Sequence, residues 1–172
     1  IAVAEDGRRV RFPALGRTTG DWGGGVSLAK DVLWSSARAE DGRGPATTLA
    51  ARVAAHFDLP TAVSVSEAIH LGDIDRERSH ELIPILFDAA TDGDDVARAL
   101  VLRQASEIVL MVTASLTRLG LFETETDIVL VVEDSARPSL KPGPEVAVAR
   151  IDGALHDVFL SRGYVPTRRN NI

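Results

Sequence analysis

One long stretch of helical periodicity constrains the fold of this chain more than any other feature. From Asp94 to Leu119, apolar side chains recur at the three- and four-residue spacing of an α-helix. Asp94 suits a helix N-terminus, and Gly120 suits the cap at the other end. A helix of this length must bury its apolar stripe against other elements, so we expect a largely helical core with this helix at its centre. The predicted stripe consists of Val96, Leu100, Ile108, Met111, Val112, Ser115 and Leu119.

The rest of the chain combines shorter helical patterns with a few extended segments. Asp6-Gly7 lies between two extended segments and predicts a β-hairpin. The segment Thr126–Val132 is rich in β-branched and aliphatic residues, which is typical of a buried strand. We therefore assign the chain to the α/β class, mostly helical with a short hairpin and one buried strand. Residues 1–165 are expected to form one domain, and 166–172 a disordered tail. Further helices are predicted at about Val26–Ala37, Thr47–Phe57, Val65–His70, Asp75–Thr91 and Glu145–Leu160.

The composition excludes several classes of function. The net charge is −6, whereas proteins that bind nucleic acid usually carry a basic face. The chain contains no cysteine, so disulfides, thiolate zinc sites and cysteine-held iron–sulfur clusters are excluded within it. The most apolar run, Ile108–Leu116, is shorter than the roughly 20 residues of a membrane span. We expect a cytoplasmic protein with neither a nucleic-acid nor a membrane partner.

A glycine cluster concentrates tight backbone geometry around one carboxylate. The segment Gly20–Gly25 reads Gly-Asp-Trp-Gly-Gly-Gly and precedes the helix expected from Val26. Glycine allows positive φ and a close approach of the backbone to a ligand. Two interpretations follow from the spacing alone. Asp21 either caps the following helix or belongs to a ligand site.

Several well-known site signatures are missing from the sequence. The segment Gly23-x-Gly25 lacks the third glycine of a dinucleotide fingerprint, because Leu28 stands in its place. No GxxxxGK[ST] phosphate loop occurs in the sequence, and no serine lies in a nucleophile-elbow pattern. Metal-ligand spacing is also lacking among the four histidines, which are His56, His70, His80 and His156.

The order of segments around the glycine cluster resembles a known family. Phe12–Gly16 comes first, then Gly20–Gly25 and a helix, then Asp41–Pro45, and then helices that contain Asp92-Gly93-Asp94. This order is similar to the C-terminal half of the BadF/BadG/BcrA/BcrD ATPase family, specifically its N-acetylglucosamine kinase-like branch. The similarity covers about Ile1–Leu130. It implies that residues 1–165 form the C-terminal lobe of an actin-like, ribonuclease H-like ATPase fold, so the chain is expected to be a fragment of a longer protein.

The resemblance also implies a substrate site. The family's Gly-Asp motif, whose aspartate contacts the hydroxyls of the sugar, matches Gly20-Asp21. A Gly-Trp-Gly segment that packs against the sugar aligns with Ala14-Leu15-Gly16, where only Gly16 matches. The implied substrate-binding residues are therefore Gly16, Gly20 and Asp21. A carboxylate that accepts from vicinal hydroxyls fixes a pyranose ring.

The resemblance places no catalytic residue in this chain. The family's phosphate motifs and catalytic aspartate lie before the position of Ile1. We expect the parent protein to transfer the γ-phosphate of ATP, with Mg²⁺, to the 6-hydroxyl of an amino sugar such as N-acetylglucosamine, and this chain alone to be inactive. The expected partners are the amino sugar, ATP held through the other lobe, and a second copy in a homodimer.

Two departures from the family pattern leave alternatives open. The family's buried strand ends in glycines near the nucleotide, whereas Val131-Val132-Glu133 stands here. Another glycine of the adenosine pocket aligns with Glu81. These departures favour a non-catalytic sugar-sensing or interaction domain as the alternative. The family's activators of radical enzymes hold an iron–sulfur cluster through cysteines, so a chain without cysteine fits them poorly.

Overall fold

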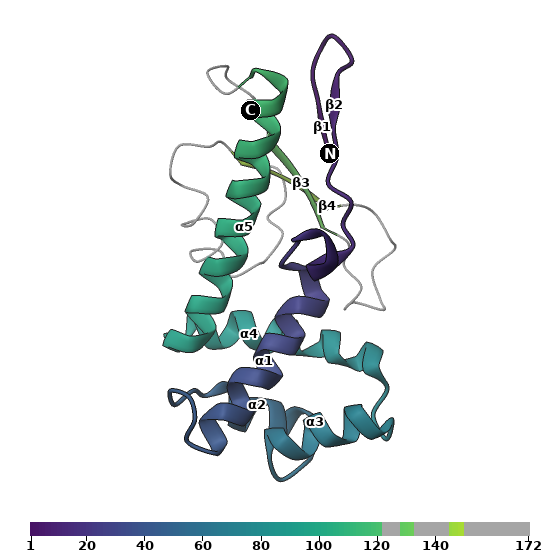
Figure 1. Cartoon of the computed structure of the whole chain (residues 1–172). Helices are drawn as coiled ribbons and strands as arrows, with labels where there is room; N and C mark the ends of the chain where they lie inside the picture. The colour runs from purple at the N-terminus through teal and green to yellow at the C-terminus, as the bar shows by residue number, and fades with distance from the viewer. Residues whose placement is uncertain (122–127, 133–144, 150–172) are drawn as a thin grey trace.

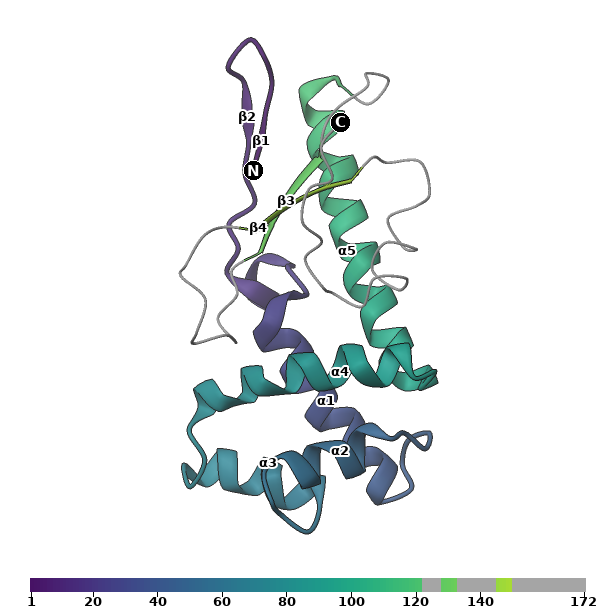
Figure 2. The ribbon, with the colours of Figure 1, turned by 180° about the vertical axis from the view of Figure 1, so that it is seen from behind.

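The computed structural model describes residues 1–121, 128–132 and 145–149. Helices α2, α3 and α4 gather toward one end of α1, a β-hairpin extends beyond the other end, and α5 runs from the first group to the side of the hairpin (Figures 1 and 2). The α-helices are α1 (Gly24–Glu40), α2 (Leu49–His56), α3 (Ala62–Leu71), α4 (Leu82–Thr91) and α5 (Asp95–Leu119). Two 3₁₀ helices, η1 (Gly16–Thr19) and η2 (Arg76–Glu81), precede α1 and α4.

The core lies where α1, α2, α3, α4 and α5 meet. Each helix contributes an apolar face, because side chains three and four residues apart lie on the same side. Burying such faces against one another is the main favourable term in folding, at roughly 25 cal/mol for each Å² of apolar surface removed from water. The large apolar side chains with no exposed surface are Leu49, Leu82, Leu86, Val32, Val53, Val65 and Val101.

Helix α5 confirms the predicted long helix but buries a different stripe. Its N-cap is Asp94, whose carboxylate accepts from the Ala97 amide, and Gly120 closes it in the left-handed conformation. The predicted stripe is wrong by one residue in the first half of the helix. Leu100 and Ile108 are only partly buried against the core. The fully buried positions there are Ala97, Val101 and Ala105, mostly small residues that allow α5 to approach its neighbours closely.

The helix predicted over Asp75–Thr91 is divided in the structure into η2 and α4. Pro84 explains the division. A proline ring clashes with the carbonyl four residues earlier inside a continuous helix, but it is tolerated in the first turn. Pro84 lies in the first turn of α4, which begins at Leu82.

Two short antiparallel sheets complete the described residues. The predicted hairpin is confirmed as β1 (Ala2–Val3) paired with β2 (Arg9–Val10). The predicted strand is confirmed as β3 (Ile128–Val132), which pairs with β4 (Glu145–Ala149). The helix predicted from Glu145 is therefore wrong over β4, where the alternating Val146 and Val148 suit a strand.

The described residues are mostly helical with two-stranded hairpins, which is compatible with a piece of an α/β fold. The remainder of the helix predicted to Leu160, and the predicted tail 166–172, lie outside the described residues.

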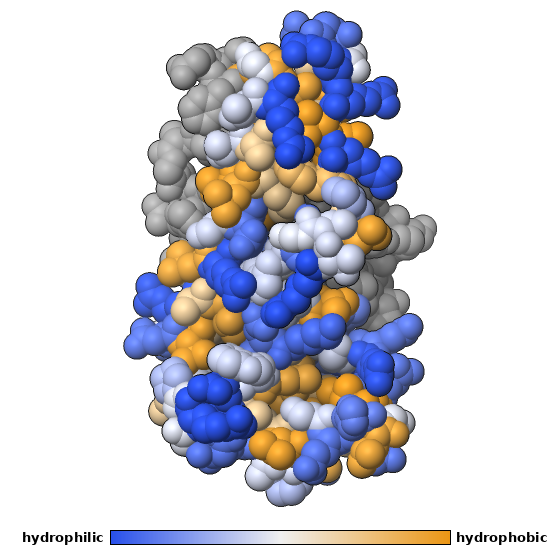
Figure 3. Space-filling model, viewed as in Figure 1, coloured by the Kyte–Doolittle hydropathy of each residue, from blue (hydrophilic) through white to orange (hydrophobic). Residues whose placement is uncertain are grey.

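By length and composition α5 could cross a membrane. Its most apolar run, Ile108–Leu116, is nevertheless shorter than the roughly 20 residues of a membrane span. Its most apolar 18-residue window has a mean hydropathy of 1.4, and 22% of that window is buried. A core helix of a soluble protein meets the same criteria. On the face shown in Figure 3, hydrophobic residues are interspersed with hydrophilic ones. In this structure Ala97, Val101 and Ala105 of α5 are buried in the helical core.

Candidate functional site

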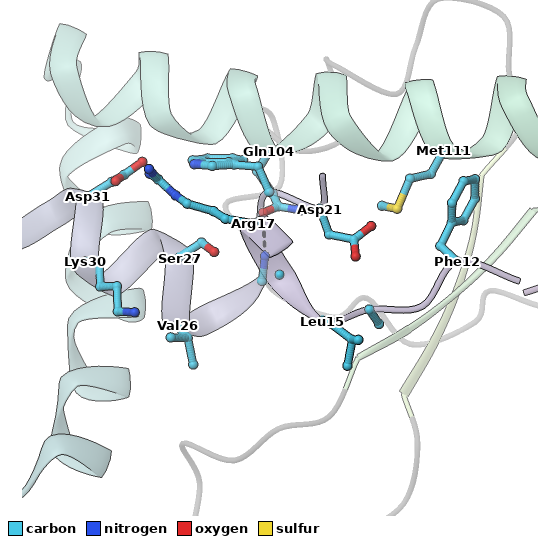
Figure 4. Close-up of a pocket in the computed structure, with 15 residues that line it drawn as sticks. Phe12, Leu15, Arg17, Asp21, Val26, Ser27, Lys30, Asp31, Gln104 and Met111 are labelled. Carbon is cyan, nitrogen blue, oxygen red and sulfur yellow. Dashed lines mark hydrogen bonds between the residues drawn. The ribbon is translucent and has the colours of Figure 1, made fainter. Parts of the chain in front are cut away.

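A pocket of about 710 Å³ lies where η1, the start of α1 and the middle of α5 meet. We call it the α1 pocket. Phe12, Leu15 and Met111 contribute apolar walls on one side, and Arg17, Lys30 and Asp31 contribute charged groups on the other (Figure 4). Its volume falls within the usual range of small-molecule sites, roughly 300–1,000 Å³. The α1 pocket is therefore large enough for a monosaccharide with substituents.

The loop before α1 folds so that Asp21 faces this pocket. Gly16 starts η1 with a φ of 66°, and Gly20 ends it with a φ of 80°, which are left-handed conformations that favour glycine. The amide of Asp21 donates to the carbonyl oxygen of Gly16 at 3.0 Å and closes the loop. Gly16 and Asp21 both line the pocket, and Gly20 directly precedes Asp21. The structure thus brings the three sequence-predicted site residues to one place.

Asp21 does not cap α1, so the helix-capping interpretation of this residue is wrong. The N-cap of α1 is Gly23, with no side-chain cap bond. The half-buried Asp21 carboxylate instead accepts from Thr19, with Thr19 Oγ1 2.5 Å from Asp21 Oδ2. No other side-chain bond of Asp21 occurs among the described residues. One of its carboxylate oxygens is thus available to a ligand.

Gln104 of α5 is a residue of the site that sequence reasoning missed. The amide of Gly24, in the first turn of α1, donates to Gln104 Oε1 at 2.8 Å (Figure 4). Gly23 packs so closely that a Cβ there would lie 2.5 Å from the same oxygen, and its φ is 121°. The positive φ favours glycine at position 23, and the close approach of Gln104 leaves no room for a side chain unless Gln104 moves. No sequence signal links residues 80 positions apart, so only the fold could reveal the pair.

Two cations, Arg17 and Lys30, and two carboxylates, Asp21 and Asp31, line the pocket. Asp31 lies 3.8 Å from Arg103, which also stacks over the Trp22 ring at 4.0 Å. Arg17 and Lys30 form no ion pair within the part of the chain that the structure describes. The pocket therefore offers one carboxylate without a cationic partner, Asp21, and two cations without an anionic one.

The positions that the family resemblance assigns to adenosine carry other roles. Glu81 lies 2.8 Å from Arg78 and 2.7 Å from His56. The hydrogen bonds from Arg78, helped by those from His56, lower the pKa of Glu81 to about 2 despite its partial burial. Val131 and Val132 continue strand β3, and Glu133 lies outside the described residues.

Among the described residues, the position that the resemblance assigns to an adenosine-pocket glycine does not fit a bound nucleotide. The side chain of Glu81 is tied into a local ion pair where the family has a glycine. Among residues 1–121 and the two described strands, no group of three or more histidine, aspartate or glutamate side chains could hold a metal ion.

Comparison with protein-family models, with curated proteins and with solved structures finds no match to the chain.

Proposed function

We propose that this chain is the sugar-binding lobe of an N-acetylglucosamine kinase-like protein and holds an amino sugar in the α1 pocket. One observation carries the proposal. The Asp21 carboxylate, placed by the Gly16–Gly20 loop, faces a pocket instead of capping the adjacent helix. The family resemblance assigns sugar contact to the same three residues, Gly16, Gly20 and Asp21.

The chemistry of the α1 pocket suits a pyranose. A carboxylate accepts from two neighbouring hydroxyls and forms charge-assisted hydrogen bonds, which are about twice as strong as neutral ones. Thr19 holds one oxygen of Asp21 in place. Phe12, Leu15 and Met111 supply apolar surface for the C–H face of a sugar ring. In the parent protein, binding here would orient the sugar for a reaction whose catalytic groups come from elsewhere.

We expect Asp21→Asn to weaken the binding of N-acetylglucosamine while leaving the fold intact. The amide keeps the shape of the side chain but loses the charged acceptor, so the loss should be about 2–3 kcal/mol, the range for hydrogen bonds to a charged group. Isothermal titration calorimetry of the 172-residue chain measures the affinity. Asp73→Asn is the matched control, because Asp73 is exposed and outside the pocket. Equal affinities for the wild type and Asp21→Asn would overturn the proposal.

A specific observation favours a second candidate, a non-catalytic sugar sensor. The ion pairs of Glu81 with Arg78 and His56 occupy the place of a glycine in the family's adenosine pocket. A protein that has lost its nucleotide site could still bind sugar and respond to it. The full-length parent protein distinguishes the two. ATP consumption that depends on N-acetylglucosamine supports the kinase, and sugar binding without any such consumption supports the sensor.

A further inference from the structure

Acidic and basic residues are unequally distributed along the described chain. Residues 39–95 contain twelve aspartates and glutamates against four arginines and lysines. Residues 1–38 and 96–121 together contain five acidic residues and nine basic ones. The acidic segment 39–95 includes α2, α3 and α4, which gather toward one end of α1 (Figure 1). Negative charge is therefore concentrated at this helical end, where its field attracts cationic partners.

A groove of about 400 Å³ lies at this acidic end, between α1 and α3. We call it the α3 groove. One face of α3 lines it at the three- and four-residue spacing of a helix surface, and Ala37 of α1 completes the lining. The α3 residues are Val63, Ser66, Glu67, His70 and Leu71. From the first to the last of them the helix rises by about 12 Å, roughly two turns, so the groove suits an elongated occupant.

The α3 groove and its surroundings present large apolar side chains to solvent. Leu71, the last residue of α3, is 75% exposed. Trp34 lies one turn before Ala37 on the same side of α1 and is 61% exposed. Arg38 stacks over the Trp34 ring at 4.6 Å and donates to the carbonyl oxygen of Arg43. Exposed apolar surface beside a groove is typical of binding sites, and tryptophan is enriched among the residues that contribute most to binding.

Carboxylates without cationic partners accompany this apolar surface. Four exposed carboxylates lie on α3 or shortly after it, and none of them forms an ion pair within residues 1–121. They are Glu67, Asp73, Asp75 and Glu77. Glu67 lines the groove, and the other three follow Leu71 closely in the sequence. The basic residues between them are His70 and Arg76. Lysines or arginines of a partner would find complementary charges here.

From the groove and its acidic border we propose that the α3 groove binds a cationic amphipathic helix of a partner protein. The apolar face of that helix packs on Leu71 and the groove, and its cations lie beside Glu67 and the carboxylates that follow α3. Helix-in-groove recognition uses apolar anchors at i, i+3 or i+4 and i+7, which match a groove about two turns long. The inference does not depend on the sugar site, because no residue of the α3 groove lines the α1 pocket.

The test measures the binding of a synthetic peptide by fluorescence anisotropy at low salt. The peptide contains leucine and lysine only, has about 15 residues so that a helix can form, and carries its leucines on one helical face. One control peptide has the same composition with the leucines spread around the helix, and another has glutamate in place of lysine. We expect the amphipathic leucine–lysine peptide to bind at least about tenfold more tightly than either control. Its affinity should fall as salt rises, because the carboxylates are exposed.

Two variants of the 172-residue chain locate the binding site. Leu71→Ser should weaken binding of the peptide about tenfold through loss of an apolar contact. Its control is Leu110→Ser, since Leu110 is a leucine of α5 that is 61% exposed and outside the groove. Glu67→Gln/Asp73→Asn should weaken binding and reduce its dependence on salt.

The matched control for the charge variant is Glu5→Gln/Asp95→Asn, which removes two exposed carboxylates outside the groove. Circular dichroism checks that all variants keep the fold. Equal binding to wild type and Leu71→Ser, or equal binding of the peptide with scattered leucines, would overturn the inference, as would no binding up to about 1 mM peptide. Sedimentation tests a different occupant. Self-association of the wild type that is lost in Leu71→Ser would assign the groove to a second copy of the chain and overturn the inference of a cationic partner.

Discussion

Replacement of Leu86 by alanine is expected to lower the free energy of unfolding by about 2–5 kcal/mol. Leu86 lies on α4 with no exposed surface, inside the cluster of side chains that joins the five α-helices. Truncation removes buried apolar surface and leaves a cavity that close-packed neighbours fill only in part. Urea denaturation followed by circular dichroism measures the change.

The matched control is Leu110→Ala on α5. Leu110 is 61% exposed, so the same truncation should change stability by no more than about 0.5 kcal/mol. Equal losses for the two variants would contradict the assignment of the core to the helical cluster. A leucine that is 0% exposed should also protect its surroundings, so the backbone amides of α4 should exchange hydrogen slowly in the wild type.

Local rules predicted the elements of the fold better than their packing. The caps at Asp94 and Gly120 and the Asp6-Gly7 hairpin depend on residues that are neighbours in the sequence, and the structure confirms them. The buried face of α5 does not follow from the same rules. Periodicity marks large apolar residues such as Leu100, but close helix packing selects the small residues Ala97 and Ala105 for the seam. Which of two adjacent stripes is buried depends on partners elsewhere in the chain.

The same limit applies to the candidate site. The glycines at 16 and 20 and the intervening loop could be predicted from the sequence, since a positive φ favours glycine at both positions. The role of Gly23 could not be predicted, because its close neighbour Gln104 lies on α5, far away in the sequence. Strand β4 is a further case. Val146 and Val148 alternate as in a strand, but Val148 also continues a helical spacing with later residues of the sequence, and pairing with β3 decides between the two. Both features, the close approach of Gln104 to Gly23 and the strand conformation of β4, therefore depend on contacts between residues far apart in the sequence.

Replacement of Asp94 by alanine is expected to lower the free energy of unfolding by about 2–3 kcal/mol at pH 7. This carboxylate joins two helices. It caps α5 through the Ala97 amide at 2.9 Å and accepts from the Thr48 amide at 2.6 Å, at the start of α2. The hydroxyls of Thr47 and Thr48 donate to it as well, each at 2.9 Å. The sequence predicted a cap at Asp94 and a separate one at Thr47-Thr48; in the structure Asp94 accepts at the start of both helices, and Thr47 Oγ1 also accepts from the Leu49 amide of α2 at 3.2 Å. Thermal or urea unfolding measures the loss.

Asp95→Ala is the control for this variant, because the adjacent carboxylate is exposed and has no ion pair among the described residues, so its expected contribution is that of a carboxylate near the dipole of α5, about 0.3–1 kcal/mol. A loss for Asp94→Ala no larger than that of the control would contradict the two-helix role. Asp94→Asn should fall between the wild type and Asp94→Ala, because the amide keeps one acceptor oxygen but loses the charge.

The stability contributed by Asp94 should disappear in acid. The direction of this pH dependence follows from the pKa of the carboxyl. Burial raises the pKa of Asp94, but the hydrogen bonds from Ala97, Thr48 and Thr47 together outweigh it and hold that pKa below its usual value. The unfolded chain, with a pKa of about 3.9, then binds the proton first, so stability is present above that pH and is lost as the pH falls through the folded pKa. The stability difference between wild type and Asp94→Ala should be constant from pH 7 to about pH 5 and should narrow below about pH 4.

Glu81, with a pKa of about 2, adds a loss of stability in acid as well, but its ion pairs are exposed and screened by salt. Subtracting the Asp94→Ala curve removes that shared contribution, so a difference that stays constant down to pH 2 would show that the charge of Asp94 does not stabilise the fold.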